Sequence, residues 1–147
     1  MQSRNRQAAL CILRRNHTFL VAEIRDPHTG RVYHRPPGGG IEKNEIPEEA
    51  VRRELQEELG ITLSTIQALG SIDHIWFWKG YEVHERAWLF LADSSEHPHL
   101  ENGETPEILE ADGDRFTTHW RSIREIDDSL PPICPSTLLQ FLRPLLA

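Results

Sequence analysis

The stretch from residue 38 to residue 61, GGGIEKNEIPEEAVRRELQEELGI, constrains this chain more than any other part of the sequence. Three glycines lead into a short acidic turn, and strong helix formers follow from Glu48 to Leu59. Pro47 at the start and Gly60 just past the end favour helix boundaries at these two positions. We therefore predict a helix between them, which the chain enters from a glycine-rich loop.

Two faces of this helix have opposite character. Val51 and Leu55 belong to an apolar stripe that predicts packing on a core. Glu54, Glu57 and Glu58 stand at i, i+3 and i+4, so their carboxylates share one face, where like charges repel by a few tenths of a kcal/mol per pair. A hard divalent cation such as Mg²⁺ reverses that cost, because it binds carboxylate oxygens while keeping several waters. Without an ion, the same residues are a solvated acidic face.

The spacing of the whole stretch favours the metal-binding interpretation. It resembles the Nudix box, the signature of Nudix hydrolases, with the pattern G-x5-E-x7-R-E-U-x-E-E-x-G-U, where U is an aliphatic residue. The residues that fill its fixed positions, without a gap, are Gly39, Glu45, Arg53, Glu54, Leu55, Glu57, Glu58, Gly60 and Ile61. The resemblance implies an α+β fold, the Nudix-type α/β/α sandwich with a central mixed β-sheet.

The resemblance also implies a reaction, the metal-dependent hydrolysis of a diphosphate linkage in a nucleoside diphosphate derivative or a nucleoside triphosphate. Glu54, Glu57 and Glu58 would bind Mg²⁺, or Mn²⁺ in its place, together with a backbone carbonyl at Gly39. We assign catalysis to Glu54, Glu57 and Arg53, with Glu54 as the candidate base and Arg53 bracing the carboxylates. The alternative is a module of the same fold that binds a nucleotide or a partner without turnover.

Three residues outside the box are candidates for substrate binding. Arg35 lies beside the Pro-Pro-Gly turn, where it can contact a phosphate or remain an ordinary surface arginine. Trp76 and Trp78 fall on one side of an extended segment and Phe77 on the other. The two tryptophans can form a stacking wall for a nucleobase or fill the core between sheet and helix.

Acidic residues dominate residues 93–115, the longest segment without a clear strand or helix pattern. Nudix proteins commonly recruit a further acidic residue from a late loop, and this segment offers Glu110, Asp112 and Asp114. The sequence does not choose among them. The eight histidines lack the spacing of a metal site, so we treat them as ordinary residues.

The remaining pattern predicts one domain over residues 1–147. Apolar or β-prone runs bounded by turn residues predict strands, which we expect at 8–14, 17–24, 31–35, 65–75, 81–92 and from 119. Prolines at 131, 132 and 135 precede a last helix, whose leucines from Leu138 onwards are spaced to dock on the sheet.

Composition limits the partners of the chain. Its formal net charge of −7 argues against broad binding to a nucleic-acid backbone. Bound cations still let an acidic protein bind a small phosphoanhydride such as a nucleotide. We expect neither a membrane span nor a signal peptide, because the apolar runs are too short. Cys11 and Cys134 form no disulfide or zinc pattern, which predicts a reducing cytoplasm. The family resemblance allows a homodimer.

Overall fold

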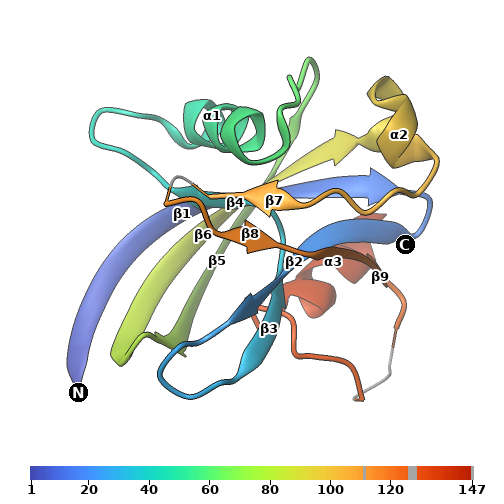
Figure 1. The fold of residues 1–147 in the computed structure, drawn as a ribbon. Coiled ribbons are helices and arrows are strands. Elements are labelled where there is room, and N and C mark those ends of the chain that lie inside the picture. The colour runs from blue at the N-terminus through green and yellow to red at the C-terminus, as the bar shows by residue number, and fades with distance from the viewer. Residues whose placement is uncertain (111, 126–128, 147) are drawn as a thin grey trace.

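A computed structural model describes residues 1–110, 112–125 and 129–146, and shows a curled mixed sheet with helices on both faces (Figure 1). The strands are β1 (Gln2–Arg15), β2 (Thr18–Arg25), β3 (Val32–Arg35), β4 (Gly38–Gly40), β5 (Gln67–Trp78), β6 (Tyr81–Asp93), β7 (Ile108–Leu109), β8 (Arg115–Phe116) and β9 (Thr118–Ser122). The helices are α1 (Pro47–Leu59), α2 (Pro98–Glu101) and α3 (Leu138–Leu146), with a 3₁₀ turn at Ser94–Glu96.

Strand β1 organises the sheet. It pairs in parallel with β6 along almost its whole length, and antiparallel with β2 and β4 on its other edge. The order is β3-β2-β1-β6-β5, with β4 beside β1 and β9 beside β2. The ends of three strands project beyond the others as a curved ribbon, which we call the extension (Figure 1). It consists of Gln2–Gln7, Asp73–Trp78 and Tyr81–Arg86.

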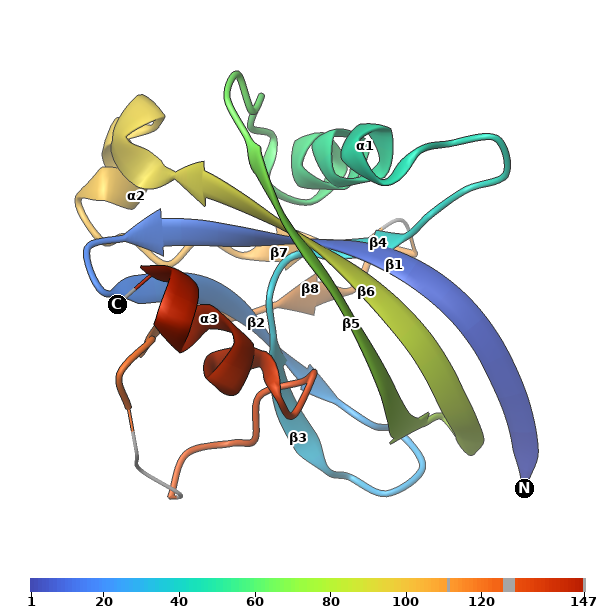
Figure 2. The same cartoon turned by 180° about the vertical axis from the view of Figure 1, so that it is seen from behind.

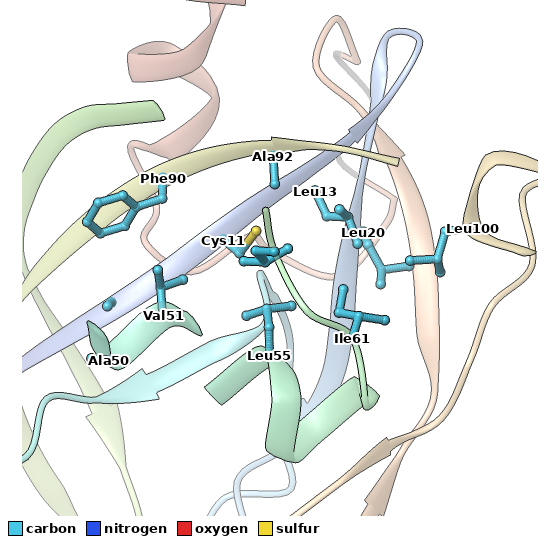
Figure 3. Packing of buried hydrophobic residues seen from close by; sticks show 12 residues of the cluster. Cys11, Leu13, Leu20, Ala50, Val51, Leu55, Ile61, Phe90, Ala92 and Leu100 are labelled. Carbon is cyan, nitrogen blue, oxygen red and sulfur yellow. The ribbon is translucent and has the colours of Figure 1, made fainter. Parts of the chain in front are cut away.

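Side chains of β1 point alternately to the two faces of the sheet, and they contribute to a hydrophobic core on each face. Cys11 and Leu13 point to the α1 side, where they join Val51 and Leu55 of the helix (Figure 3). The residues that alternate with them, such as Ile12 between the two, point to the opposite core, which α3 covers (Figure 2). Each fully buried leucine of this kind contributes about 2 kcal/mol of transfer free energy. Burial on both faces therefore fixes α1 against the strands that carry the glycines.

The predicted helix matches α1, and Gly60 ends it in the left-handed conformation at φ 66°. The predicted strands are found, but two are longer than their apolar runs. Strand β1 begins at Gln2, and its first six residues, which are exposed and polar, are held in the strand by parallel pairing with β6. Strand β5 continues through the tryptophans to Trp78, and the three glycines form the short strand β4. Among the described residues, no helix has the length and apolar character to cross a membrane.

Candidate active site

The glycines of β4 let a carboxylate approach the backbone. A Cβ atom at Gly39 would lie 2.7 Å from Oε1 of Glu54, so only glycine leaves room for that side chain as it stands. Gly38 has a φ of +139°, and a Cβ there would lie 2.1 Å from the carbonyl oxygen of Ala9. Its N–H donates to Oε1 of Glu58 at 2.8 Å. Two box glutamates are thus held against two glycines of the loop.

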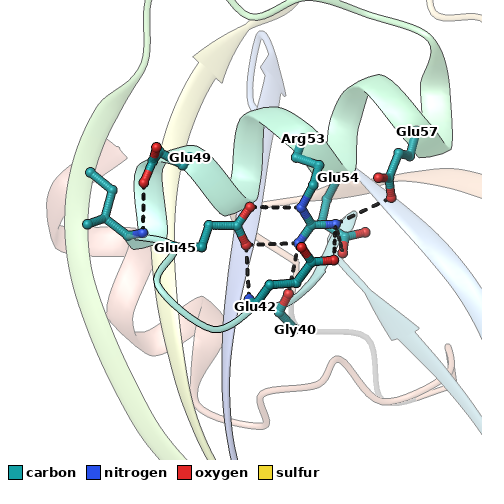
Figure 4. Close-up of polar contacts among 8 residues, drawn as sticks. Gly40, Glu42, Glu45, Glu49, Arg53, Glu54 and Glu57 are labelled. Carbon is teal, nitrogen blue, oxygen red and sulfur yellow. Dashed lines mark hydrogen bonds and ion pairs between the residues drawn. The ribbon is translucent and has the colours of Figure 1, made fainter.

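Arg53 connects several acidic residues of the box (Figure 4). Its guanidinium donates twice to Glu45, at 2.8 and 3.0 Å, and once to the carbonyl oxygen of Gly40 at 3.1 Å. The same group donates to Glu54 at 3.0 Å and to Glu57 at 3.3 Å. Arg53 therefore contacts the loop and the helix carboxylates at once, and Glu45 bridges the loop to the helix.

One arginine does not neutralise this many carboxylates. Burial raises the pKa of Glu54, although Arg53 opposes the shift. Burial also raises the pKa of Glu58, together with the negative charges of Glu110 and Glu54, to about 9. Glu57 is more than half exposed at the rim of the cluster. The cluster is short of positive charge where its carboxylates are most buried.

The late acidic loop reaches this cluster. Glu110, Asp112 and Asp114 all line a cleft of about 500 Å³ together with Glu54 and Glu58. Glu110 is the one that shares a side-chain hydrogen bond with Glu58, and burial raises its pKa as well. The structure thus distinguishes Glu110 from the two aspartates, which the sequence could not do.

Arg35 also lines the cleft but differs from the predicted surface arginine. It is only 8% exposed, and it donates to Glu85 at 2.8 Å and to the sulfur of Cys134 at 3.4 Å. Its guanidinium carbon lies 4.9 Å from the ring centroid of Trp76. The surface alternative is wrong, and a phosphate would have to compete with Glu85 for this side chain.

The two tryptophans lie on one side of β5, as the alternation predicts, while Phe77 is 48% exposed on the other. Trp76 and Trp78 stack with their centroids 5.2 Å apart, and both line the cleft. Trp76 is 8% exposed and packs edge-on against Tyr33. It therefore fills a small core that the extension shares with Tyr33 and Cys134, not the core under α1, whereas Trp78 is only half-buried.

Sequence reasoning missed a charged network behind the tryptophans. Glu85 has a fully buried side chain, and it contacts Arg6 at 2.9 Å, Arg35 at 2.8 Å and His74 at 2.8 Å. Burial alone would raise the pKa of Glu85, but its partners outweigh burial and lower it to about 2. The network depends on the pairing of β1 with β6, which places Arg6 opposite Glu85 and which no local sequence pattern predicts.

A broader trough of about 1270 Å³ continues from the cleft along the extension. Five residues line both hollows: Arg6, Gly40, Trp76, Trp78 and Lys79. The two hollows therefore meet at the aromatic wall, so that the acidic cluster opens towards a larger surface of mixed charge.

A second group of potential metal ligands lies on β2, β3 and β9. Ligand atoms of Glu23, His34 and His119 all lie within 4.8 Å of one another. However, Arg121 donates to Nδ1 of His34 at 2.8 Å, and arginine can only donate. Nε2 of His34 therefore carries the proton and donates to Glu23 at 3.1 Å, which removes the lone pair a metal needs. We therefore assign no metal to these residues.

Residues 4–137 of the chain match the family model of the NUDIX domain. The chain belongs to the NUDIX domain family. An RNA pyrophosphohydrolase of Vibrio atlanticus is 31% identical over 108 residues, which cover 61% of this chain and 59% of the relative. One of Photobacterium profundum is 30% identical over 107 residues, covering 61% and 58%. This Nudix chain thus spans less than two thirds of the length of these curated relatives.

Solved structures agree on the fold. The crystal structure of a MutT NUDIX hydrolase from Burkholderia pseudomallei has a TM-score of 0.64 and 25% identity, and the match covers 93% of this chain and 96% of that one. The MutT protein from Methanosarcina mazei Go1 also has a TM-score of 0.64, at 18% identity, over 100% and 99% of the two chains. The predicted α+β Nudix fold is confirmed.

Proposed function

We propose that this Nudix chain hydrolyses a diphosphate linkage with the help of a divalent cation, Mg²⁺ or alternatively Mn²⁺. The supporting observation is that Glu54, Glu58 and Glu110 converge on one cleft with raised pKa values. Their oxygens are the donors that Mg²⁺ prefers. A cation there would relieve the repulsion that otherwise protonates Glu58, so the residues present fit the ion that the family implies.

Each box residue has a proposed part in the reaction. Glu54, Glu57 and Glu58 would hold the ion, with the backbone carbonyl oxygen of Gly39 as a further donor. When bound, the ion neutralises phosphate charge and assists the activation of water. Glu54 faces the cleft and can accept a proton from the attacking water. Arg53 keeps the carboxylates in place through its bonds to Glu54 and Glu57.

The tryptophans that line the cleft have a proposed role in binding the substrate. Trp78, half-buried and stacked on Trp76, offers a face for a base, and this stacking is worth about 1–3 kcal/mol per base. Arg35, which packs against Trp76, can contribute positive charge near the phosphates. Arg6 can do the same where the cleft meets the trough. We propose a nucleoside triphosphate or nucleoside diphosphate derivative as the substrate.

Two observations support a larger alternative substrate. The trough of about 1270 Å³ next to the cleft leaves room beyond a mononucleotide. The two relatives are called RNA pyrophosphohydrolases, and an RNA can carry a phosphoanhydride in a terminal polyphosphate. A short RNA with a terminal triphosphate therefore belongs beside the nucleotides in any substrate test.

The test is release of phosphate or pyrophosphate from a panel of nucleotides and this RNA, with Mg²⁺ and with a chelator. We expect the wild type to hydrolyse at least one compound with Mg²⁺ only, and Glu57→Gln to lose most of that activity. Equal turnover by both proteins would contradict the site assignment. Binding of a panel member without any turnover would favour the non-catalytic module.

A further inference from the structure

Asp26 is a buried carboxylate that the proposed reaction does not use. It follows β2 directly and begins the turn to β3, yet it is only 1% exposed. Two of its bonds stay inside this turn: Oδ1 accepts from the N–H of His28 at 2.9 Å, and Oδ2 accepts from the hydroxyl of Thr29 at 3.2 Å. Such Asx contacts are common in turns and do not by themselves require burial.

The third bond of Asp26 goes to a different part of the chain. Oδ1 also accepts from the backbone N–H of Lys79 at 3.2 Å, 53 positions further along the sequence. Lys79 and Gly80 form the two-residue turn between β5 and β6. Burial would raise the pKa of Asp26, but these N–H bonds outweigh burial and keep it below its usual range. The carboxylate therefore remains charged and joins two turns.

The second turn benefits from this support. Lys79 has a φ of 53° and Gly80 of 82°, the left-handed pair that a two-residue hairpin needs. A lysine is an unfavourable choice at the first of these positions. Gly80 packs so closely that a Cβ atom there would lie 3.1 Å from the His28 ring. The two turns are thus in direct contact as well as hydrogen-bonded.

Both turns form the wall of the acidic cleft. Arg25 and Pro27 flank Asp26, Trp78 precedes Lys79, and all four of these neighbours line the cleft. We propose that Asp26 is a positioning residue: by binding the Lys79 N–H it holds the tip of the extension, and with it Trp78, at the distance from β2 and β3 that the substrate requires. This inference rests on the proposed function for its effect on catalysis, but not for the contact itself.

The decisive variant is Asp26→Ser, whose shorter side chain can keep the bond to His28 but cannot reach Lys79. We expect about a tenfold rise in KM with kcat changed less than about twofold, since a bond to a charged acceptor accounts for roughly one power of ten. Asp26→Asn retains an acceptor oxygen for Lys79, although without the charge, and should have a KM closer to the wild-type value than to that of Asp26→Ser. Thr29→Val perturbs only the first turn and should leave KM unchanged.

Amide hydrogen exchange measures the contact without any substrate. In the wild type we expect the Lys79 amide to be protected although it lies at a hairpin tip, and Asp26→Ser to exchange there about ten times faster. An unprotected Lys79 amide in the wild type overturns the proposal without need of a variant. So does an Asp26→Ser protein with faster exchange but wild-type KM. If no panel compound is hydrolysed, the proposed function fails, while the exchange data still decide whether Asp26 holds the turn.

Discussion

Two clusters of charged residues lie at the cleft in this Nudix fold, and the pKa values of their buried carboxylates are shifted in opposite directions. On α1, Arg53 contacts Glu54, the backbone N–H of Gly38 donates to Glu58, and the pKa values of both glutamates are raised. In the extension, Glu85 is buried among two arginines and a histidine, and its pKa falls to about 2. Burial acts on both clusters, so the balance of neighbouring charge decides the sign.

This difference distinguishes a candidate ligand site from a charged network that serves the fold. Glu85 has its counter-charges within the chain, so its charge is compensated without a ligand. The α1 cluster has more carboxylates than cations and gains stability from any divalent ion that enters. A deficit of positive charge at a cleft is therefore better evidence for a metal site than the number of acidic residues.

The largest expected effect tests the α1 cluster. Glu54→Gln removes a charge from the proposed metal site and the candidate base, so we expect kcat to fall by about 1,000-fold. The matched control is Glu49→Gln on the same helix, whose carboxylate accepts from the N–H of Ile46 at 3.0 Å and does not line the cleft in the described part of the chain. Steady-state kinetics at saturating Mg²⁺ should separate the two, and similar losses in both would contradict a specific role.

A second pair of variants sharpens the contrast in stability. Glu85→Gln leaves Arg6 and Arg35 without their partner, and breaking a buried ion pair costs about 3 kcal/mol of unfolding free energy. Glu58→Gln should instead raise the melting temperature of the metal-free protein near neutral pH, because glutamine is neutral without taking up a proton on folding and keeps an acceptor for Gly38. Thermal or denaturant unfolding measures both, and changes of the same sign would refute the contrast.

The pH dependence of stability should show the two signs in one protein. Glu58 has a folded pKa of about 9 against a usual 4.5, so the folded state holds an extra proton and stability falls as pH rises between these values. Glu85 has a folded pKa of about 2, so its contribution is present above pH 4.5 and is lost as pH falls towards 2. Unfolding of the metal-free protein across this range should show a decline at both ends. Glu58→Gln should remove only the alkaline part.

The smallest effect concerns the wall between the two clusters. Trp78→Ala should raise KM about tenfold with little change in kcat, because stacking on a base is worth about 1–3 kcal/mol. Phe77→Ala is the matched control, since Phe77 lies on the opposite side of β5 and is 48% exposed. A KM that responds equally to both variants would argue against stacking in the cleft.

The sequence predicted the α1 cluster well because its information is local. Pro47 and Gly60 mark the ends of the helix, and i, i+3 and i+4 spacing places the carboxylates on one face whatever the rest of the fold does. Arg53 reaches Glu57 within the same helix, and Glu45 precedes that arginine by only eight residues. A motif whose members lie so close together in the sequence can be interpreted without tertiary structure.

The extension could not be predicted in the same way, because its contacts join distant segments. Glu85 meets Arg6 because parallel β1 and β6 place the two residues opposite each other, and it meets Arg35 of β3, a strand that is not its neighbour in the sheet. A polar residue in an exposed run and one in a buried ion pair look alike in the sequence. The choice of Glu110 over Asp112 likewise depends on how the late loop meets α1.

Calorimetric titration of Mg²⁺ and Mn²⁺ into the protein tests most directly whether the α1 cluster is a cation site. We expect saturable binding by the wild type, strong weakening in Glu54→Gln and Glu58→Gln, and little change in Glu49→Gln. Absence of binding in the wild type, with or without a non-hydrolysable nucleotide, or equal binding by all four proteins, would contradict the assignment.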